Sequence, residues 1–165
     1  MKKVLLATLL ALGLSNIAMA DDIVDVANHD GSLKTFMTAV EAAGLTKAIN
    51  GAGPITIFAP NDAAFAKLPK EKLDALLKDK AALTALLNYH IVGAKITAAD
   101  VEAGKVKSVE GHDLKLSITD GVKVNGVAVV GGGDLKADNG EIHIIDTVLS
   151  QEPAGKKKLS KKKTG

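Results

Sequence analysis

Apolar residues recur at helical spacing in the N-terminal part of the chain. One stripe lies between Ser32, a residue suited to cap the start of a helix, and Gly44, a residue type that often follows a helix end. Its apolar positions are Leu33, Phe36, Met37, Val40 and Ala43. This spacing predicts a helix that packs one face on a core.

Between residues 46 and 90 the pattern predicts one strand among several short helical segments. The strand is the β-branched run Ile55–Phe58, which Pro60 ends. The helical segments are a turn at Thr46–Ile49, a segment capped by Asn61 or Asp62, a helix opened by Pro69 and a helix at Ala81–Asn88.

Beyond Tyr89 the pattern changes to short alternating or β-branched runs bounded by Gly, Asp or Asn. These runs predict strands at Ile91–Val92, Val106–Val109, Leu114–Thr119, Val122–Val124, Val127–Val130, Leu135–Ala137 and Ile142–Leu149. Asp120-Gly121, Asn125-Gly126 and Asn139-Gly140 suit hairpin turns, and Gly131–Gly133 is interpreted as a flexible loop. Helices followed by an antiparallel sheet predict a single α+β domain.

The composition removes several classes of function. The 165 residues contain no Cys, which excludes a disulfide scaffold, a thiol nucleophile, a thiolate zinc site and an iron–sulfur cluster. Aromatic residues make up only 2% of the chain, so a platform for stacking nucleic-acid bases is not expected. The chain also lacks Arg and any groove-entering motif, so we expect no sequence-specific nucleic-acid binding.

Residues 1–20 have the pattern of a signal peptide. Lys2 and Lys3 precede the apolar run Val4–Leu14, and Ala18-Met19-Ala20 fits the rule for signal-peptidase cleavage. The apolar run is too short to span the ~30 Å hydrocarbon core of a membrane. We expect cleavage after Ala20 and a periplasmic or secreted product.

Charge is distributed unevenly along the rest of the chain. Residues 21–155 carry 13 Lys and 19 acidic residues, a formal charge of −6, whereas residues 156–165 carry six Lys and no acid.

Residues 153–165 should be disordered when free, because they have little apolar surface to offset the entropy of ordering. The six tail cations favour binding to an anionic polymer or lipid surface. A solubilising tail, or one that folds back on the acidic body, is the alternative. These cations are Lys156, Lys157, Lys158, Lys161, Lys162 and Lys163.

Three segments carry a recognisable pattern in their order and spacing: Thr56–Phe65, Leu87–Val92 with its Tyr-His pair, and Asn139–Leu149. They resemble, in that order, the first signature segment, the Tyr-His element and the closing segment of the fasciclin domain family. The resemblance implies a twisted β-wedge or sandwich of about seven strands with a layer of N-terminal helices. It places this fasciclin-like domain at residues 21–152.

The resemblance also implies a function. It suggests an exported, non-enzymatic adhesion or matrix-interaction module that binds a cell-surface or matrix protein or glycan, without a cofactor, as a monomer or weak oligomer. Because some algal fasciclin-like proteins bind carotenoids, a carrier of an apolar small molecule such as a carotenoid is the alternative.

Tyr89, His90 and Ile91 are the candidate partner-binding residues, because animal fasciclin domains use a Tyr-His element with nearby aliphatic residues in receptor adhesion. The competing interpretation is packing, since Tyr at a helix-to-strand junction buries its ring while its hydroxyl finds a polar partner.

Three further polar residues have predicted structural roles. Asp62 is suited to cap a helix, Asp146 in an apolar strand needs a hydrogen-bonding partner, and His143 is interpreted as a core or half-buried side chain. No spacing among them is typical of a metal site, and no set of residues suggests a catalytic reaction.

Overall fold

The computed structural model of the chain describes residues 21–51 and 53–149. The predicted signal peptide and the basic tail therefore lie outside the described residues. The helices are α1 (Ile23–Asp30), α2 (Lys34–Ala43), α3 (Thr46–Gly51), α4 (Asp62–Ala66), α5 (Lys70–Lys78), α6 (Lys80–Tyr89) and α7 (Ala98–Ala103). The strands are β1 (Ile55–Pro60), β2 (Ile91–Val92), β3 (Lys105–Lys107), β4 (Asp113–Ser117), β5 (Lys123–Val124), β6 (Val127–Ala137) and β7 (Gly140–Ile145).

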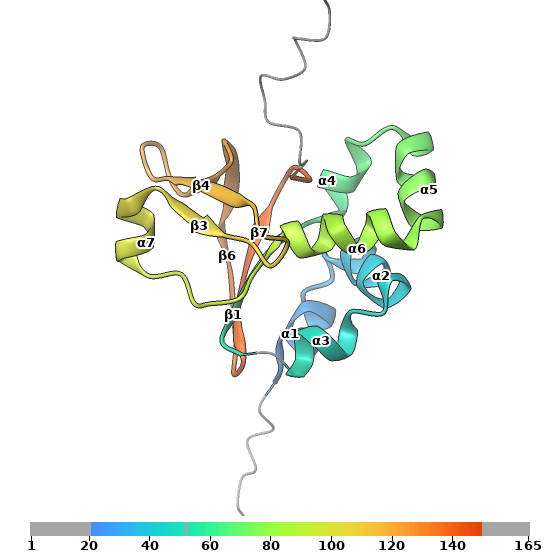
Figure 1. Cartoon of the computed structure of the whole chain (residues 1–165), viewed down its shortest axis with the longest axis horizontal. Coiled ribbons are helices and arrows are strands. Elements are labelled where there is room, and N and C mark those ends of the chain that lie inside the picture. Colours follow the sequence, from blue (N-terminus) through green and yellow to red (C-terminus); the bar gives the residue numbers. More distant parts are fainter. Residues whose placement is uncertain (1–20, 52, 150–165) are drawn as a thin grey trace, which may run out of the picture.

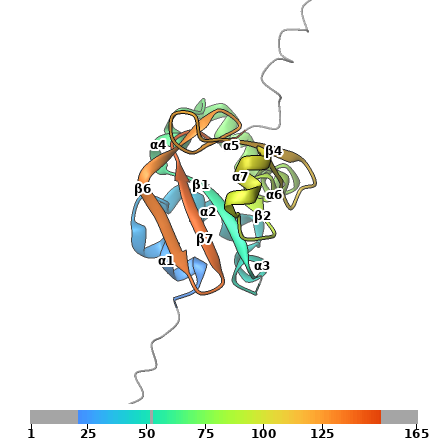
Figure 2. The same cartoon turned by 90° about the vertical axis from the view of Figure 1, so that its left-hand side faces the viewer.

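The predicted α+β class and the number of strands are confirmed. Helices α1 to α6 gather on one side, β3, β4 and α7 lie on the other, and β1 and β7 run between them (Figure 1). The seven strands form one sheet in the order β2-β1-β7-β6-β5-β4-β3, and Figure 2 shows β6, β7, β1 and β2 side by side. The described part of the chain has no helix with the length and apolar character needed to cross a membrane.

The prediction of an antiparallel sheet is wrong for its centre. Strand β1 runs parallel to β7, with Ile57 opposite Ile142, whereas the other strand pairs are antiparallel. All six positions of β1 are buried, as expected for a strand covered on both faces. The sheet curls until its two ends approach, and the backbone N–H of Val109 donates to the carbonyl of Ile91 at 2.7 Å.

Several local predictions also need correction. Gly131–Gly133 belongs to β6, which is one strand with a register shift between Val129 and Asp134, and is not a flexible loop. The last strand ends at Ile145, before the predicted Leu149. Sequence patterns had missed α1 and α7, although both have side-chain caps, from Asp22 and from Thr97 respectively.

Ser32 does not cap α2. Its hydroxyl contacts the carboxylate of Asp30, and the N-cap position of α2 is Leu33, which has no side chain able to bond the backbone. The carboxylate of Asp62 supplies the missing acceptor, since Asp62 Oδ1 accepts from the Thr35 N–H at 2.8 Å.

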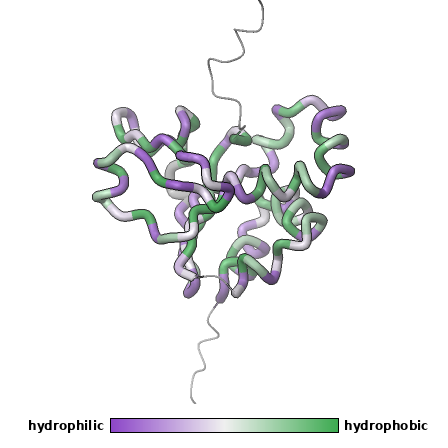
Figure 3. The backbone as a smooth tube through the Cα atoms, in the orientation of Figure 1, coloured by the Kyte–Doolittle hydropathy of each residue, from purple (hydrophilic) through white to green (hydrophobic). Residues whose placement is uncertain are grey.

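Two apolar clusters lie on opposite faces of β1 and β7. The first joins α1, α2, α3 and α6 to Ile57 and Ile142, and the second joins Phe58 and Ile145 to the side chains of β4 and β5. Figure 3 shows apolar segments where helices meet the central strands. The central strands thus connect both halves of one molecule.

Candidate functional site

Tyr89, His90 and Ile91 lie where α6 ends and β2 begins. Their relative exposures are 6%, 1% and 6%, so all three are core residues. The Phe58 N–H donates to the His90 carbonyl at 2.8 Å, which fixes this junction against β1.

Both ring nitrogens of His90 have a backbone partner. Nδ1 donates to the Leu86 carbonyl at 2.8 Å, and Nε2 accepts from the Leu149 N–H at 2.9 Å. This pair of bonds requires the neutral ring with its proton on Nδ1. Burial lowers the pKa of His90 from its ordinary 6.5 to about 4, opposed by the Leu86 carbonyl, which raises it. The imidazole therefore links the end of α6 to Leu149, in the segment that follows the last strand, through hydrogen bonds.

The Tyr89 hydroxyl joins α6 to the sheet. It accepts from Asn125 Nδ2 at 2.7 Å, while Asn125 Oδ1 accepts from the Lys115 N–H at 2.7 Å. Asn125 has a φ of 51°, a left-handed conformation that Asn tolerates better than most residues. The sequence pattern predicts only a turn at Asn125, because nothing in the pattern links Asn125 to Tyr89.

The burial of Tyr89, His90 and Ile91 favours a packing role over the predicted partner-binding role. Their side chains are committed to the core and to internal hydrogen bonds. These contacts support the packing role, and binding of a partner through this junction stays a prediction.

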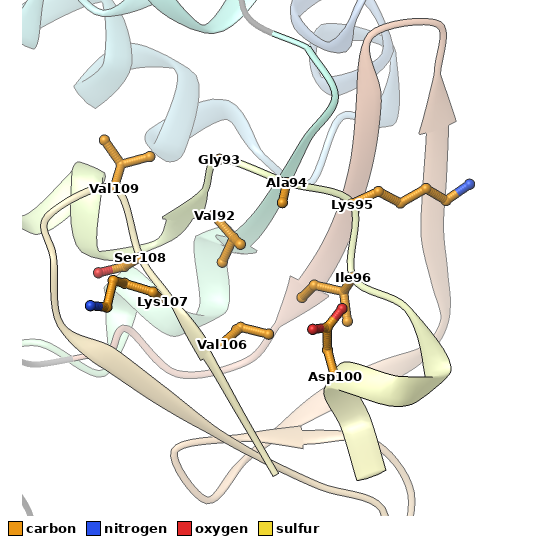
Figure 4. A pocket seen from close by; sticks show the side chains of 10 residues that line it. All are labelled: Val92, Gly93, Ala94, Lys95, Ile96, Asp100, Val106, Lys107, Ser108 and Val109. Atoms are coloured by element: carbon orange, nitrogen blue, oxygen red, sulfur yellow. The ribbon is translucent and has the colours of Figure 1, made fainter. Parts of the chain in front are cut away.

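Two cavities flank the place where the ends of the sheet meet, and they share Gly93 and Val109. One, of about 360 Å³, lies between residues 92–96 and 106–109, with Asp100 of α7 at its border. Figure 4 shows Val92, Ile96 and Val106 directed into it, whereas Lys95 and Lys107 extend away. The other, of about 440 Å³, lies under α3 and the loop before β1 and is lined mainly by apolar residues.

Comparison with known proteins supplies the family. A family model described as the Fasciclin domain matches residues 31–151. The chain belongs to the fasciclin domain family. It is 39% identical over 161 residues to Protein sll1483 of Synechocystis sp., a match covering 84% of this chain and 89% of that one.

More distant relatives share the same domain. The chain is 31% identical over 135 residues to the cell surface glycolipoprotein MPB83 of Mycobacterium bovis, covering 78% of this chain and 60% of MPB83. A solved FAS1 domain pair from the insect cell adhesion molecule Fasciclin I superposes with a TM-score of 0.50 at 22% identity, covering 73% of this chain and 46% of that structure. That likeness supports the fold alone.

The remaining sequence-based candidates in this fasciclin domain have defined surroundings. Asn61, and not Asp62, caps α4 by accepting from the Ala64 N–H at 2.8 Å. The His143 ring stacks on Phe58 with centroids 5.5 Å apart, and its Nδ1 lies 2.7 Å from Asp134 Oδ1. Asp146 lies 3.4 Å from Lys67 Nζ, at the surface.

These side chains do not converge on one centre. Among residues 21–51 and 53–149, no group of three or more His, Asp or Glu side chains could hold a metal ion. His29 and His112 are both exposed. The six lysines of the tail lie outside the described residues.

Proposed function

We propose that this fasciclin domain is an exported, non-enzymatic adhesion module that binds a cell-surface or matrix protein or glycan. Family membership over nearly the whole described body carries the proposal. The name of one matched relative, a cell surface glycolipoprotein, agrees with a role outside the cytoplasm. The burial of the junction at Tyr89 supports a structural role for that segment, and we therefore expect another part of the surface to contact the partner.

The basic tail is proposed as a second, electrostatic attachment. Six lysines within residues 156–163 would displace counterions from an anionic polymer or lipid surface, and such binding weakens as salt rises. The body, with a formal charge of −6 over residues 21–155, is not expected to bind the same surface by charge.

The test is binding of the mature protein to isolated envelope material and whole cells over a salt series. Three proteins are compared: residues 21–165, residues 21–155, and the full mature chain with the six tail lysines replaced by Gln. Salt-resistant binding by all three supports adhesion through the body. Salt-sensitive binding by the first alone assigns attachment to the tail, and no binding by any of them contradicts the proposal.

The cavity of about 440 Å³ favours a second candidate function, the carriage of an apolar small molecule such as a carotenoid. Leu45, Ile49 and Ile91 are among its apolar lining residues, and Asn88 adds an amide. Pockets of this character suit ligands that are largely apolar with one polar group. Protein expressed in its native host would then yield a coloured or lipophilic compound on solvent extraction. Ala48→Trp, which adds bulk at the exposed rim of the cavity, should reduce the amount bound.

A further inference from the structure

Strand β3 has a free edge. It is the last strand in the sheet order, and only β4 pairs with it. Backbone hydrogen bonds on the β4 side occur at Ser108 and Gly104. The Ser108 N–H donates to the His112 carbonyl, and the Gly104 carbonyl accepts from the Leu116 N–H. Bonded and non-bonded residues alternate in an antiparallel ladder, so Lys105 and Lys107 direct their N–H and C=O groups away from β4. Within the described residues, no backbone hydrogen bond uses these groups.

This edge faces the smaller of the two cavities. The two ends of the sheet are joined by the bond from Val109 to Ile91, and beyond it the segments 92–96 and 106–108 are separated by a space of about 360 Å³. Figure 4 shows apolar side chains from both segments, Val92, Ile96 and Val106, facing this space. The unpaired backbone N–H and C=O groups of β3 thus lie next to apolar side chains. This arrangement suits the addition of a further strand, whose backbone would pair with β3 and whose alternate side chains would enter the cavity.

The charge at Lys105 favours an acidic occupant, whereas Lys107 lies opposite Asp113 on β4. Lys105 lies directly opposite Lys115, both side chains are exposed, and neither has an acidic partner among the described residues. Like charges directly opposite one another on paired strands are destabilising. An acidic side chain on the other flank of Lys105 would relieve this repulsion.

We propose that an extended segment of a partner protein, with alternating acidic and apolar residues, adds to the free edge of β3. The backbone of this segment pairs with Lys105 and Lys107, its apolar side chain enters the cavity beside Val106, and its acidic side chains flank the two lysines. The chain's own basic tail has the opposite charge from the one this edge selects. The inference rests on the proposed function and names the kind of partner that such a module binds.

The test uses the full mature chain and a blocked five-residue peptide of alternating Glu and Val, with a Lys and Val peptide as control. We expect the acidic peptide to slow amide hydrogen exchange at Lys105 and Lys107. Exchange at Val106 should change little, because its place in the ladder already pairs it with Leu114. Equal slowing by both peptides, or slowing at neither lysine, overturns the proposal.

Variants separate backbone pairing from charge. Lys107→Pro removes an edge N–H that β4 does not use, so it should abolish peptide binding with little change in the thermal midpoint. Lys107→Ala keeps that N–H and should bind more weakly than wild type but more tightly than Lys107→Pro. Lys105→Glu should reverse the preference toward the Lys peptide, and it provides a test should the proline variant fold poorly. An unchanged peptide preference in Lys105→Glu overturns the proposal.

The same variants separate this inference from the proposed function. If Lys107→Pro and Lys105→Glu bind envelope material as tightly as wild type, strand addition is wrong and adhesion through another surface stands. If the wild-type protein binds no envelope material, the proposed function fails whatever the peptides do.

Discussion

At the scale of single residues, His90 links pH to stability. In the folded protein the ring stays neutral down to a pKa of about 4, whereas in the unfolded chain it takes up a proton near its ordinary pKa of 6.5. The unfolded state therefore binds more protons between these values, and the stabilisation is fully present above pH 6.5 and is lost as pH falls toward 4. The loss should reach about 3 kcal/mol, measured by urea unfolding over this pH range.

Carboxylates titrate in part of the same range, so the effect of His90 is isolated by comparison. His90→Gln should be less stable at neutral pH but should show a flatter dependence between pH 4 and 6.5. His29→Gln replaces an exposed imidazole and should follow the wild-type curve. Parallel curves for wild type and His90→Gln would contradict the assignment.

Asp62 is expected to act across the fold and not on its own helix. Its carboxylate accepts from the Thr35 N–H, one of the backbone groups that the start of α2 would otherwise leave unpaired. Asp62→Ala should lower the free energy of unfolding by about 1 kcal/mol, as loss of an N-cap does. Asp62→Asn keeps an acceptor oxygen and should retain most of this stability, as measured by chemical denaturation. Equal losses in both variants would show that the hydrogen bond at Thr35 is not responsible.

At the scale of the secondary-structure elements, Gly140 controls how closely β1 and β7 pair. A Cβ atom at this position would overlap the Ile55 carbonyl oxygen and crowd the Ile23 side chain. Gly140→Ala should therefore destabilise the protein by about 2 to 3 kcal/mol through overpacking. Gly51→Ala is the control, since no atom lies within 4 Å of its added Cβ. A thermal midpoint for Gly140→Ala equal to that of Gly51→Ala would contradict this account.

Local patterns predicted most elements but not their partners. The stripe from Leu33 to Ala43 and the Asn125-Gly126 turn were identified correctly, because helix period and turn chemistry depend on neighbouring residues. Strand β6 was divided at Gly131–Gly133, since glycines usually interrupt strands, whereas here pairing with β7 continues on both sides of a register shift. The cap of α2 was assigned to Ser32, because the true acceptor, Asp62, is 27 residues away.

Prediction of the candidate site was limited in the same way, because local patterns do not show which residues far apart in the sequence are in contact. The sequence marked Tyr89 and His90 as notable, but their roles depend on Asn125 and Leu149, which lie 36 and 59 residues further along the chain. The free edge of β3 was equally hidden, because it depends on the order of strands in the sheet. Side-chain types therefore indicated important positions, and only the topology separated buried residues from accessible ones.

At the scale of the whole molecule, the basic tail can either bind an external anionic surface or fold back onto the acidic body of the same chain. The body carries a formal charge of −6 and the tail of residues 156–165 one of +6, so attraction between them would be strongest at low ionic strength. A free tail adds no burial to the folded state, and we expect deletion of residues 156–165 to leave the thermal midpoint unchanged at both low and high salt. A tail folded onto the body would instead make the deletion destabilising at low salt only, because screening removes the attraction as salt rises. Thermal melts of both proteins over a salt series distinguish a tail available to an external anionic surface from one already occupied by its own domain.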